Sequence, residues 1–137
     1  MTTRGISEDA LLAQEACFAR AFAESDPAIA RDLYQPDVVY VSPTVRLFDW
    51  PAEIEGIERT LEFIALTIRG CSAIRYEATE RAIAPGGDVA FVRVRFDWDS
   101  GGQRLRSTYV VVYRYRGGLI ARQELYYDPS GALQRLA

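Results

Sequence analysis

The sequence predicts an α+β domain in which helices cover one face of a curved, mainly antiparallel sheet. Helix signals dominate residues 7–34, and a further amphipathic segment follows one short β-type run. From residue 72 onward the chain consists of β-type runs that alternate with glycine-containing turns. Short turns join antiparallel neighbours, so these runs predict a meander on which the helices pack.

The first helix is predicted to begin at the sequence SED of residues 7–9. A serine cap followed by acids in the first turn satisfies the free backbone N–H groups and the helix dipole. Leu11, Phe18 and Phe22 then share one face up to about residue 24. The spacing therefore predicts an amphipathic helix whose apolar side faces the sheet.

A second, shorter helix and the first strand are predicted to follow. Asp26 and Pro27 form a cap followed by proline at the first helical position, and this helix is expected to end near Tyr34. Residues 38–42, VVYVS, are rich in β-formers and end at Pro43. They predict a short strand.

Residues 43–56 read as a loop, which is unusual because it contains Phe48 and Trp50. We expect these rings to lie over the interior as a lid.

A third helix is predicted to follow and to end at Gly70. Its apolar side chains recur at helical spacing: Ile57, Leu61, Ile64, Ala65 and Ile68.

Four β-type runs complete the chain, at about 72–84, 88–99, 104–116 and 119–128. Pro-Gly-Gly, Ser-Gly-Gly and Gly-Gly turns separate them. The sequence contains no internal repeat, no low-complexity tract and no linker. Residues 1–137 are therefore expected to form a single domain.

The run FVRVRFDWD of residues 91–99 decides which face of the sheet points inward. Apolar side chains such as Phe96 and Trp98 alternate with charged ones such as Arg95 and Asp97. Burying so many charges costs several kcal/mol per ion before pairing, so the charged face is predicted to lie outside. An Arg95–Asp97 catalytic pair is then not expected.

The run at 104–116 carries apolar residues on both faces, because Val110 and Val112 share the outer one. A strand with two apolar faces is usually covered on both sides. A homodimer that packs outer sheet face against outer sheet face would cover these valines. The alternative is a monomer with exposed valines, since scattered exposed apolar residues are normal.

Composition excludes several classes of function. The net charge of −3 gives no basic surface for nucleic acid, and the absence of histidine removes His-based triads and His-containing metal sites. Cys17 and Cys71 are far apart in sequence and read as buried thiols rather than a metal motif or a disulfide. No segment predicts a membrane span or an export signal, so we expect a cytoplasmic protein without metal or cofactor.

Three segments resemble a known family: DLYQPDVVYVSP at 32–43, Gly56-Ile57 at the third helix, and the final run at 109–129. The chain is similar to SnoaL-like and ketosteroid isomerase-like proteins of the nuclear-transport-factor-2-like superfamily. The resemblance implies a cone-shaped α+β barrel, with three N-terminal helices packed on a strongly curved, mainly antiparallel sheet. It also implies an apolar pocket between sheet and helices, and dimers formed through the outer sheet face.

The parity of the strands then gives a set of inward-facing residues for a ligand pocket. Its many tyrosines need hydrogen-bond partners when buried, which suits a small, flat, hydrophobic molecule that carries oxygen atoms. The predicted pocket residues are Phe18, Phe22, Tyr40, Ser42, Trp50, Tyr76, Phe96, Trp98, Tyr109, Val111, Tyr113, Tyr115, Gln123, Leu125 and Tyr127.

The resemblance also allows a test for catalytic residues. Ketosteroid isomerases use a carboxylate base, a tyrosine and a protonated aspartate, and by alignment Ser42, Phe18 and Val111 hold these positions. None of the three supplies that chemistry, so standard isomerase activity is not expected. Epoxide hydrolases of the superfamily place a Tyr and an Asn where Tyr40 and Ser42 stand, but their last-strand aspartate corresponds to Leu125.

The weak catalytic candidates that remain are Tyr40, Ser42, Asp49 and Glu53. Asp49 and Glu53 also fit helix capping beside Pro51. Two functions stay open. The chain could be an isomerase, cyclase or hydrolase acting on a small hydrophobic oxygenated substrate. Alternatively, it could be a non-catalytic module that binds a hydrophobic ligand or a protein partner.

Overall fold

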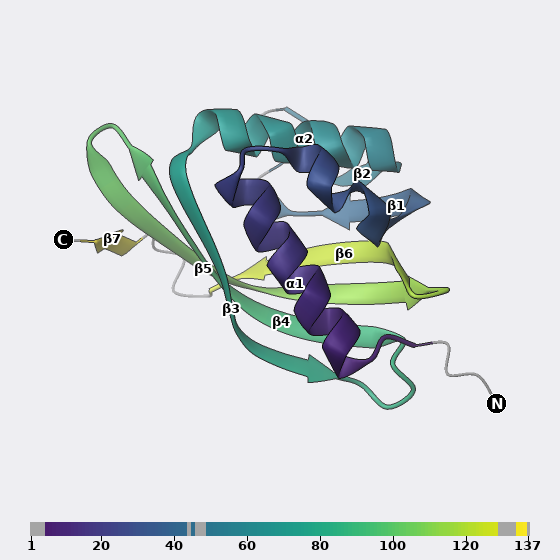
Figure 1. The fold of residues 1–137 in the computed structure, drawn as a ribbon. Coiled ribbons are helices and arrows are strands. Elements are labelled where there is room, and N and C mark those ends of the chain that lie inside the picture. The colour runs from purple at the N-terminus through teal and green to yellow at the C-terminus, as the bar shows by residue number, and fades with distance from the viewer. Residues whose placement is uncertain (1–4, 44, 46–48, 129–133, 137) are drawn as a thin grey trace.

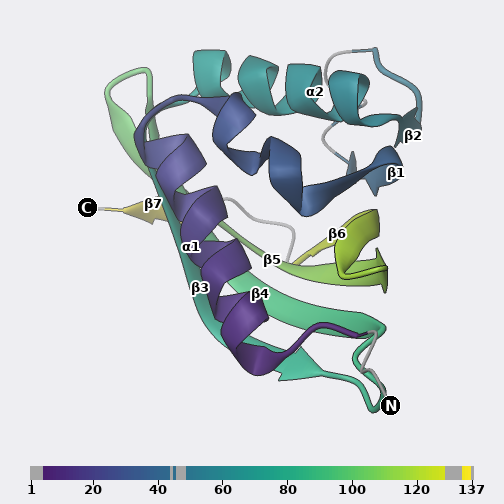
Figure 2. The ribbon, with the colours of Figure 1, turned by 45° about the vertical axis from the view of Figure 1, so that its right-hand side comes forward.

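The computed structural model describes residues 5–43, 45, 49–128 and 134–136, with the helices on one side of a sheet (Figures 1 and 2). The described helices are α1 (Glu8–Ala23), the 3-10 helix η1 (Pro27–Leu33) and α2 (Ile57–Gly70). The strands are β1 (Tyr34–Val41), β2 (Glu53–Glu55), β3 (Ser72–Ile83), β4 (Val89–Ser100), β5 (Gln103–Arg116), β6 (Leu119–Tyr127) and β7 (Gln134–Leu136). The predicted α+β class and mainly antiparallel sheet are confirmed.

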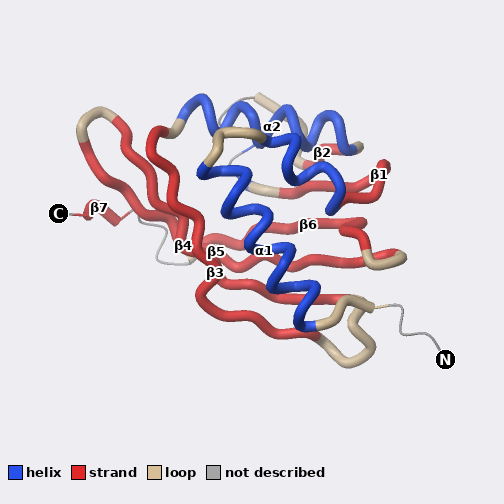
Figure 3. Tube along the Cα trace, in the orientation of Figure 1, coloured by secondary structure: helices blue, strands red, loops and turns tan. Residues whose placement is uncertain are grey.

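The sheet has the strand order β2-β1-β6-β5-β4-β3, and β7 pairs with β5 off this path (Figure 3). Every pairing is antiparallel except β1 with β6, which is parallel. Strands β2 and β3 are the two edges of this order and do not pair with each other. Within the described ranges the sheet is therefore open and not a closed barrel. The helices are also not all N-terminal to the sheet, because α2 follows β1 and β2.

The helix starts follow the sequence signals. The Ser7 side chain accepts a hydrogen bond from the Ala10 N–H at 3.1 Å and caps α1. Asp26 caps η1 in the same way through Ala28, and Pro27 occupies the first turn. In the described part of the chain, no helix is long and apolar enough to cross a lipid bilayer.

The segment between β1 and α2 differs from its prediction as a plain loop. Residues 53–55 form β2, which pairs with β1 and brings Ile54 opposite Tyr40. Helix α2 begins only after Gly56, whose φ of 93° suits glycine. Asp49 and Glu53 therefore do not cap this helix. The predicted lid residue Phe48 lies outside the described residues.

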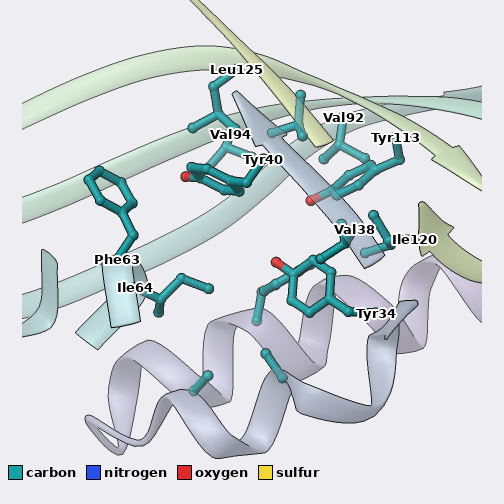
Figure 4. Close-up of a cluster of buried hydrophobic side chains, with 14 of the residues drawn as sticks. Tyr34, Val38, Tyr40, Phe63, Ile64, Val92, Val94, Tyr113, Ile120 and Leu125 are labelled. Atoms are coloured by element: carbon teal, nitrogen blue, oxygen red, sulfur yellow. The ribbon is translucent and has the colours of Figure 1, made fainter. Parts of the chain in front are cut away.

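The core lies between the sheet and the helices (Figure 4). Side chains of β1, β4, β5 and β6 converge there, and the fully buried ones include Val38, Val92, Val94, Tyr113 and Ile120. The alternation in β4 therefore has the predicted parity, since Val92, Val94 and the ring of Phe96 all point inward.

The opposite face of β4 carries ion pairs with its neighbours. Arg95 pairs with Glu77 of β3 at 2.8 Å, and Asp97 pairs with Arg106 of β5 at 2.8 Å. The Arg106 guanidinium donates to both oxygens of Asp97 and lowers the pKa of that carboxyl. Arg95 and Asp97 thus belong to a ladder of charges across the outer sheet face, in which Asp97 is only 6% exposed beside Arg106.

Candidate functional site

A cavity of about 250 Å³ opens between α2 and the inner face of the sheet. Its wall is mostly aromatic and aliphatic, with a few hydroxyl groups and one thiol. The lining residues are Phe22, Tyr40, Phe63, Ile64, Thr67, Gly70, Cys71, Phe96, Trp98, Ser107, Tyr109, Leu125 and Tyr127. Such an apolar wall with a small number of polar groups is typical of small-molecule sites.

A smaller chamber of about 30 Å³ lies deeper and shares part of this wall. Phe18 of α1, Tyr76 of β3, Val111 of β5 and Gln123 of β6 line the chamber but not the larger cavity. This volume has room for roughly one water molecule or one functional group of a ligand. We call it the inner chamber.

Two tyrosines of the cavity, Tyr40 and Tyr109, are neutral hydrogen-bonding groups. Burial raises the pKa of Tyr40 and of Tyr109, and electrostatic repulsion from Tyr127 adds to both shifts. The rings of Tyr109 and Tyr127 are 5.1 Å apart, so the cross-strand pair forms one side of the cavity. Hydroxyls held neutral in this way can donate to a ligand oxygen and do not act as bases near neutral pH.

Gln123 has a fixed orientation at the inner chamber. The Tyr34 hydroxyl donates a hydrogen bond of 2.6 Å to the Gln123 Oε1 atom, and both side chains are buried. The carbonyl oxygen of the Gln123 amide therefore accepts its hydrogen bond from Tyr34 of β1. The nitrogen end of this amide carries N–H donors only.

A buried carboxyl group lies behind the inner chamber. Glu15 of α1 is 5% exposed, and its Oε1 atom accepts a 2.6 Å hydrogen bond from the Tyr76 hydroxyl. Its Oε2 atom accepts one of 2.9 Å from the Gln14 amide, whose own oxygen accepts from the Tyr115 hydroxyl at 2.8 Å. Burial raises the pKa of Glu15, although the hydrogen bonds from Tyr76 and Gln14 oppose the shift.

Tyr113 adds a hydroxyl beside this carboxyl. The Tyr113 side chain is completely buried, and within the described residues its oxygen has no partner at hydrogen-bonding geometry. It is still close enough to Glu15 to help lower the pKa of that carboxyl. Glu15 and Gln14 thus connect tyrosines of β3 and β5 through α1.

Most of the predicted pocket residues lie around these two spaces. Phe22, Tyr40, Phe96, Trp98, Tyr109, Leu125 and Tyr127 line the cavity, and Phe18, Tyr76, Val111 and Gln123 line the inner chamber. Ser42, Trp50, Tyr113 and Tyr115 line neither space. Trp50 instead packs on Phe63 of α2, with the Arg59 guanidinium 4.5 Å from its ring centre.

Of the catalytic candidates, the structure brings Tyr40 to the cavity. Ser42 is buried but does not line it. Asp49 is exposed, and Glu53 lies on β2 with its carboxylate 3.1 Å from Arg122. Across the described residues, no carboxylate and no arginine lines either space, and no cluster of acidic or thiol side chains could hold a metal ion.

Two features of the candidate site were not among the residues predicted from the sequence: the wall contributed by α2 and the buried carboxyl of α1. Ile64 of the predicted apolar face of α2 lines the cavity, and Phe63, Thr67 and Gly70 extend that wall onto the neighbouring face of the helix. Glu15 did have a signal. It stands four residues after Leu11 and three before Phe18, on the same stripe as the apolar side chains.

Comparison with known proteins places the chain. The model of the SnoaL-like domain matches residues 15–123. The chain belongs to the SnoaL-like family. The match includes α1 from Glu15, all of the cavity-lining strands β1, β4 and β5, and β6 as far as Gln123. A search of curated proteins found no significant match for this SnoaL-like chain.

Solved structures share the fold of this SnoaL-like protein at low sequence identity. An NTF2-like protein from Anabaena variabilis has a TM-score of 0.76 at 15% identity, with 90% of each chain covered. The epoxide hydrolase/cyclase-like enzyme SalBIII, described in pyran ring formation in polyether salinomycin, has a TM-score of 0.75 at 13% identity, covering 95% of this chain and 98% of its own. TerC co-crystallised with polyporic acid has a TM-score of 0.71 at 22% identity, covering 89% and 91%.

Proposed function

We propose that this SnoaL-like protein binds a small, flat, largely apolar molecule with an oxygen substituent in the cavity beside α2. The observation that carries the proposal is the convergence of Tyr40, Tyr109 and Tyr127 on a space lined otherwise by aromatic and aliphatic side chains. Rings such as Trp98 and Phe22 offer flat apolar surface, and the hydroxyls of Tyr40 and Tyr109 offer neutral donors. The enzyme SalBIII and the TerC complex support a small-molecule role for this fold.

A direct test uses a flat two-ring probe with one carbonyl group, 2-acetylnaphthalene. Binding followed by tryptophan fluorescence is expected, because Trp98 lines the cavity. Substituting Leu125→Trp fills the cavity with a larger side chain and should abolish the signal change while the fold is retained by circular dichroism. Unaltered binding to that variant would place the probe elsewhere and contradict the proposed site.

The hydroxyl contribution is tested by Tyr109→Phe. The change keeps the ring and removes one neutral donor, so affinity for 2-acetylnaphthalene should fall roughly three- to tenfold, the worth of one hydrogen bond. Tyr126→Phe on β6 is the matched control, since Tyr126 is 57% exposed on the outer face. Equal affinity of the Tyr109→Phe variant and the native chain would remove this tyrosine from the recognition site.

Two outcomes separate an enzyme from a binding module. As an enzyme the chain would be an isomerase, a cyclase or a hydrolase of the SnoaL-like kind. Mass spectrometry of compounds that co-purify with the protein identifies the bound molecule, and incubation with fresh protein shows whether its mass or isomer composition changes. Recovery of an unaltered compound supports non-catalytic binding.

We also propose that the outer sheet face forms a homodimer interface. Phe91, Val110 and Tyr126 are 41%, 36% and 57% exposed, and they come from the adjacent strands β4, β5 and β6. Val110 lies directly opposite Tyr126, and Phe91 lies opposite Val112, which is two residues from Val110 on the same face of β5, so these side chains form one apolar patch. Arg93 and Glu124 stand opposite Val110 and Val112 and flank it. Ion pairs such as Arg95–Glu77 and Arg122–Glu124 border the patch with both signs of charge, which suits a self-complementary contact.

Light scattering tests the interface. The native chain is expected to have twice the mass of a monomer, and Val110→Asp should halve that mass because a charge is placed within the patch. Leu12→Asp on α1, where Leu12 is 44% exposed, is the control that should stay dimeric. A monomeric native chain would contradict the dimer and leave the patch for a different protein partner.

A further inference from the structure

The Glu15 carboxyl is an unusual group for its position on α1. It lies on the apolar stripe of α1 between Leu11 and Phe18, where an aliphatic side chain would pack without the cost of burying an ionisable group. Both of its oxygens are nevertheless occupied, by the Tyr76 hydroxyl and the Gln14 amide. A buried carboxyl held by specific partners next to a cavity is a candidate functional group.

Tyr76 connects this carboxyl to the ligand space. Its ring packs on Phe18 and Phe22, with ring centres 6.1 and 5.5 Å away, and it lines the inner chamber. Glu15 lines neither the chamber nor the cavity. Among the described residues, Tyr76 is the chamber-lining side chain that shares a hydrogen bond with Glu15, so it is the direct link between the carboxyl and a bound molecule.

We propose that Glu15 is a positioning residue whose protonation decides whether Tyr76 donates or accepts a hydrogen bond at the inner chamber. The inference rests on the proposed function and gives its ligand a chemical class, a planar apolar molecule whose oxygen reaches the chamber as an acceptor. Such an oxygen belongs to a ketone, an aldehyde or another carbonyl group without an O–H of its own.

The donors and acceptors of Glu15 and Tyr76 define two states, one with Glu15 ionised and one with Glu15 protonated. When Glu15 is ionised it is acceptor-only, so the Tyr76 O–H is directed to it, and Tyr76, which lines the chamber, has no O–H left to donate to a ligand. When Glu15 takes up one proton from solvent on Oε1, its new O–H can donate to the Tyr76 oxygen. The Tyr76 O–H is then free to turn to a carbonyl oxygen, while Gln14 still donates to Oε2.

Among the ionisable groups of this region, Glu15 is the one expected to change its protonation state in the measured pH series. The ionisable groups that interact with it from neighbouring elements are Tyr34 of β1, Tyr76 and Arg81 of β3, and Tyr109, Tyr113 and Tyr115 of β5. Burial raises the pKa of each of these tyrosines, so they stay protonated. Arg81 lowers the pKa of Glu15, but burial has the larger effect and raises it.

The test compares two probes of the same shape. 2-Acetylnaphthalene carries the carbonyl oxygen, and 2-isopropenylnaphthalene replaces that oxygen with a CH₂ group. Their affinities for the native protein are measured over a pH series that starts near the ordinary glutamate value of 4.5 and extends upward, the direction in which burial moves the pKa of Glu15. The ratio of the two affinities isolates the hydrogen bond to oxygen, because both probes bury the same apolar surface.

We expect this ratio to be roughly three- to tenfold higher at the acidic end, since one hydrogen bond is gained there. In Glu15→Gln, which cannot titrate, the ratio should no longer depend on pH. In Tyr76→Phe it should stay at the low value throughout. The affinity for 2-isopropenylnaphthalene should not change with pH in any of the three proteins.

Each other outcome counts against the inference. A pH-independent ratio in the native chain overturns it, and so does a pH-dependent ratio that survives Glu15→Gln. A pH dependence of the hydrocarbon probe as well would show that Glu15 acts on the fold instead of on the ligand oxygen. If neither probe binds, the proposed cavity function fails and the inference fails with it. If both bind without a pH effect, the inference alone is wrong.

Discussion

Replacing Phe18 with alanine is expected to lower the free energy of unfolding by about 3–5 kcal/mol, as for other large-to-small changes at buried aromatic residues. Phe18 is 3% exposed and lies at the centre of the aromatic core. Its ring centre is 6.1 Å from that of Tyr34, 6.1 Å from that of Tyr76 and 6.2 Å from that of Tyr113. The change therefore removes contacts to three elements at once and leaves a void that the sheet cannot close.

Urea unfolding followed by circular dichroism measures this loss. Leu12→Ala on the same helix is the control, because Leu12 is 44% exposed and should change the stability by no more than about 0.5 kcal/mol. Phe18→Leu should fall between the two. A loss below about 1 kcal/mol for Phe18→Ala would mean that the chamber collapses around the smaller residue, and the packing of α1 on β3 and β5 would need revision.

The arrangement of elements was predictable because its signals are local. The serine cap at residue 7, proline at residue 27 and the glycine turns each act within a few residues. The alternation of charged and apolar side chains in β4 predicted the inner face correctly, because Val94 is fully buried and Arg95 pairs with Glu77 outside. Ion burial is costly enough that this pattern has one stable orientation.

Two strands were not predicted, and both are short. Strand β2 is the tripeptide Glu53–Glu55 and β7 is Gln134–Leu136. Three residues give too few alternations for a period of two to be seen, so their strand state depends on the neighbours β1 and β5. The 3-10 character of η1 likewise depends on its short span between α1 and β1.

The lining of the candidate site was predictable where it depends on strand parity and was not where it depends on the rotation of a helix about its axis. Tyr40, Tyr109 and Tyr127 follow from alternation along their strands. Phe63 and Thr67 depend on how α2 is turned about its axis, and the sequence allows two adjacent faces. Glu15 was overlooked because a charged residue is normally placed outside, although its position on the stripe of Leu11 and Phe18 indicated burial.

Glu15 is also expected to make the stability of the protein fall as the pH rises. The folded-state pKa of Glu15 is raised by burial above the ordinary value of 4.5, whereas the unfolded chain should have that ordinary value. The unfolded chain then loses its proton first. The contribution of Glu15 to stability is therefore fully present below about pH 4.5 and is lost progressively as the pH rises through the raised folded-state pKa.

Comparison of the native chain with Glu15→Gln isolates this effect, because groups such as Asp97, whose pKa is lowered by Arg106, contribute equally to both proteins. The free energies of unfolding are measured in urea at a series of pH values. As the pH rises, the Glu15→Gln variant should gain stability relative to the native chain. Between the unfolded-state and the folded-state pKa of Glu15, the slope of this difference should approach about 1.4 kcal/mol per pH unit. A parallel pair of curves would show that Glu15 titrates alike in the folded and unfolded chains.

Glu15→Ala should be less stable than Glu15→Gln at every pH by about 2–4 kcal/mol, because it leaves a cavity and removes the acceptor from both the Tyr76 hydroxyl and the Gln14 amide.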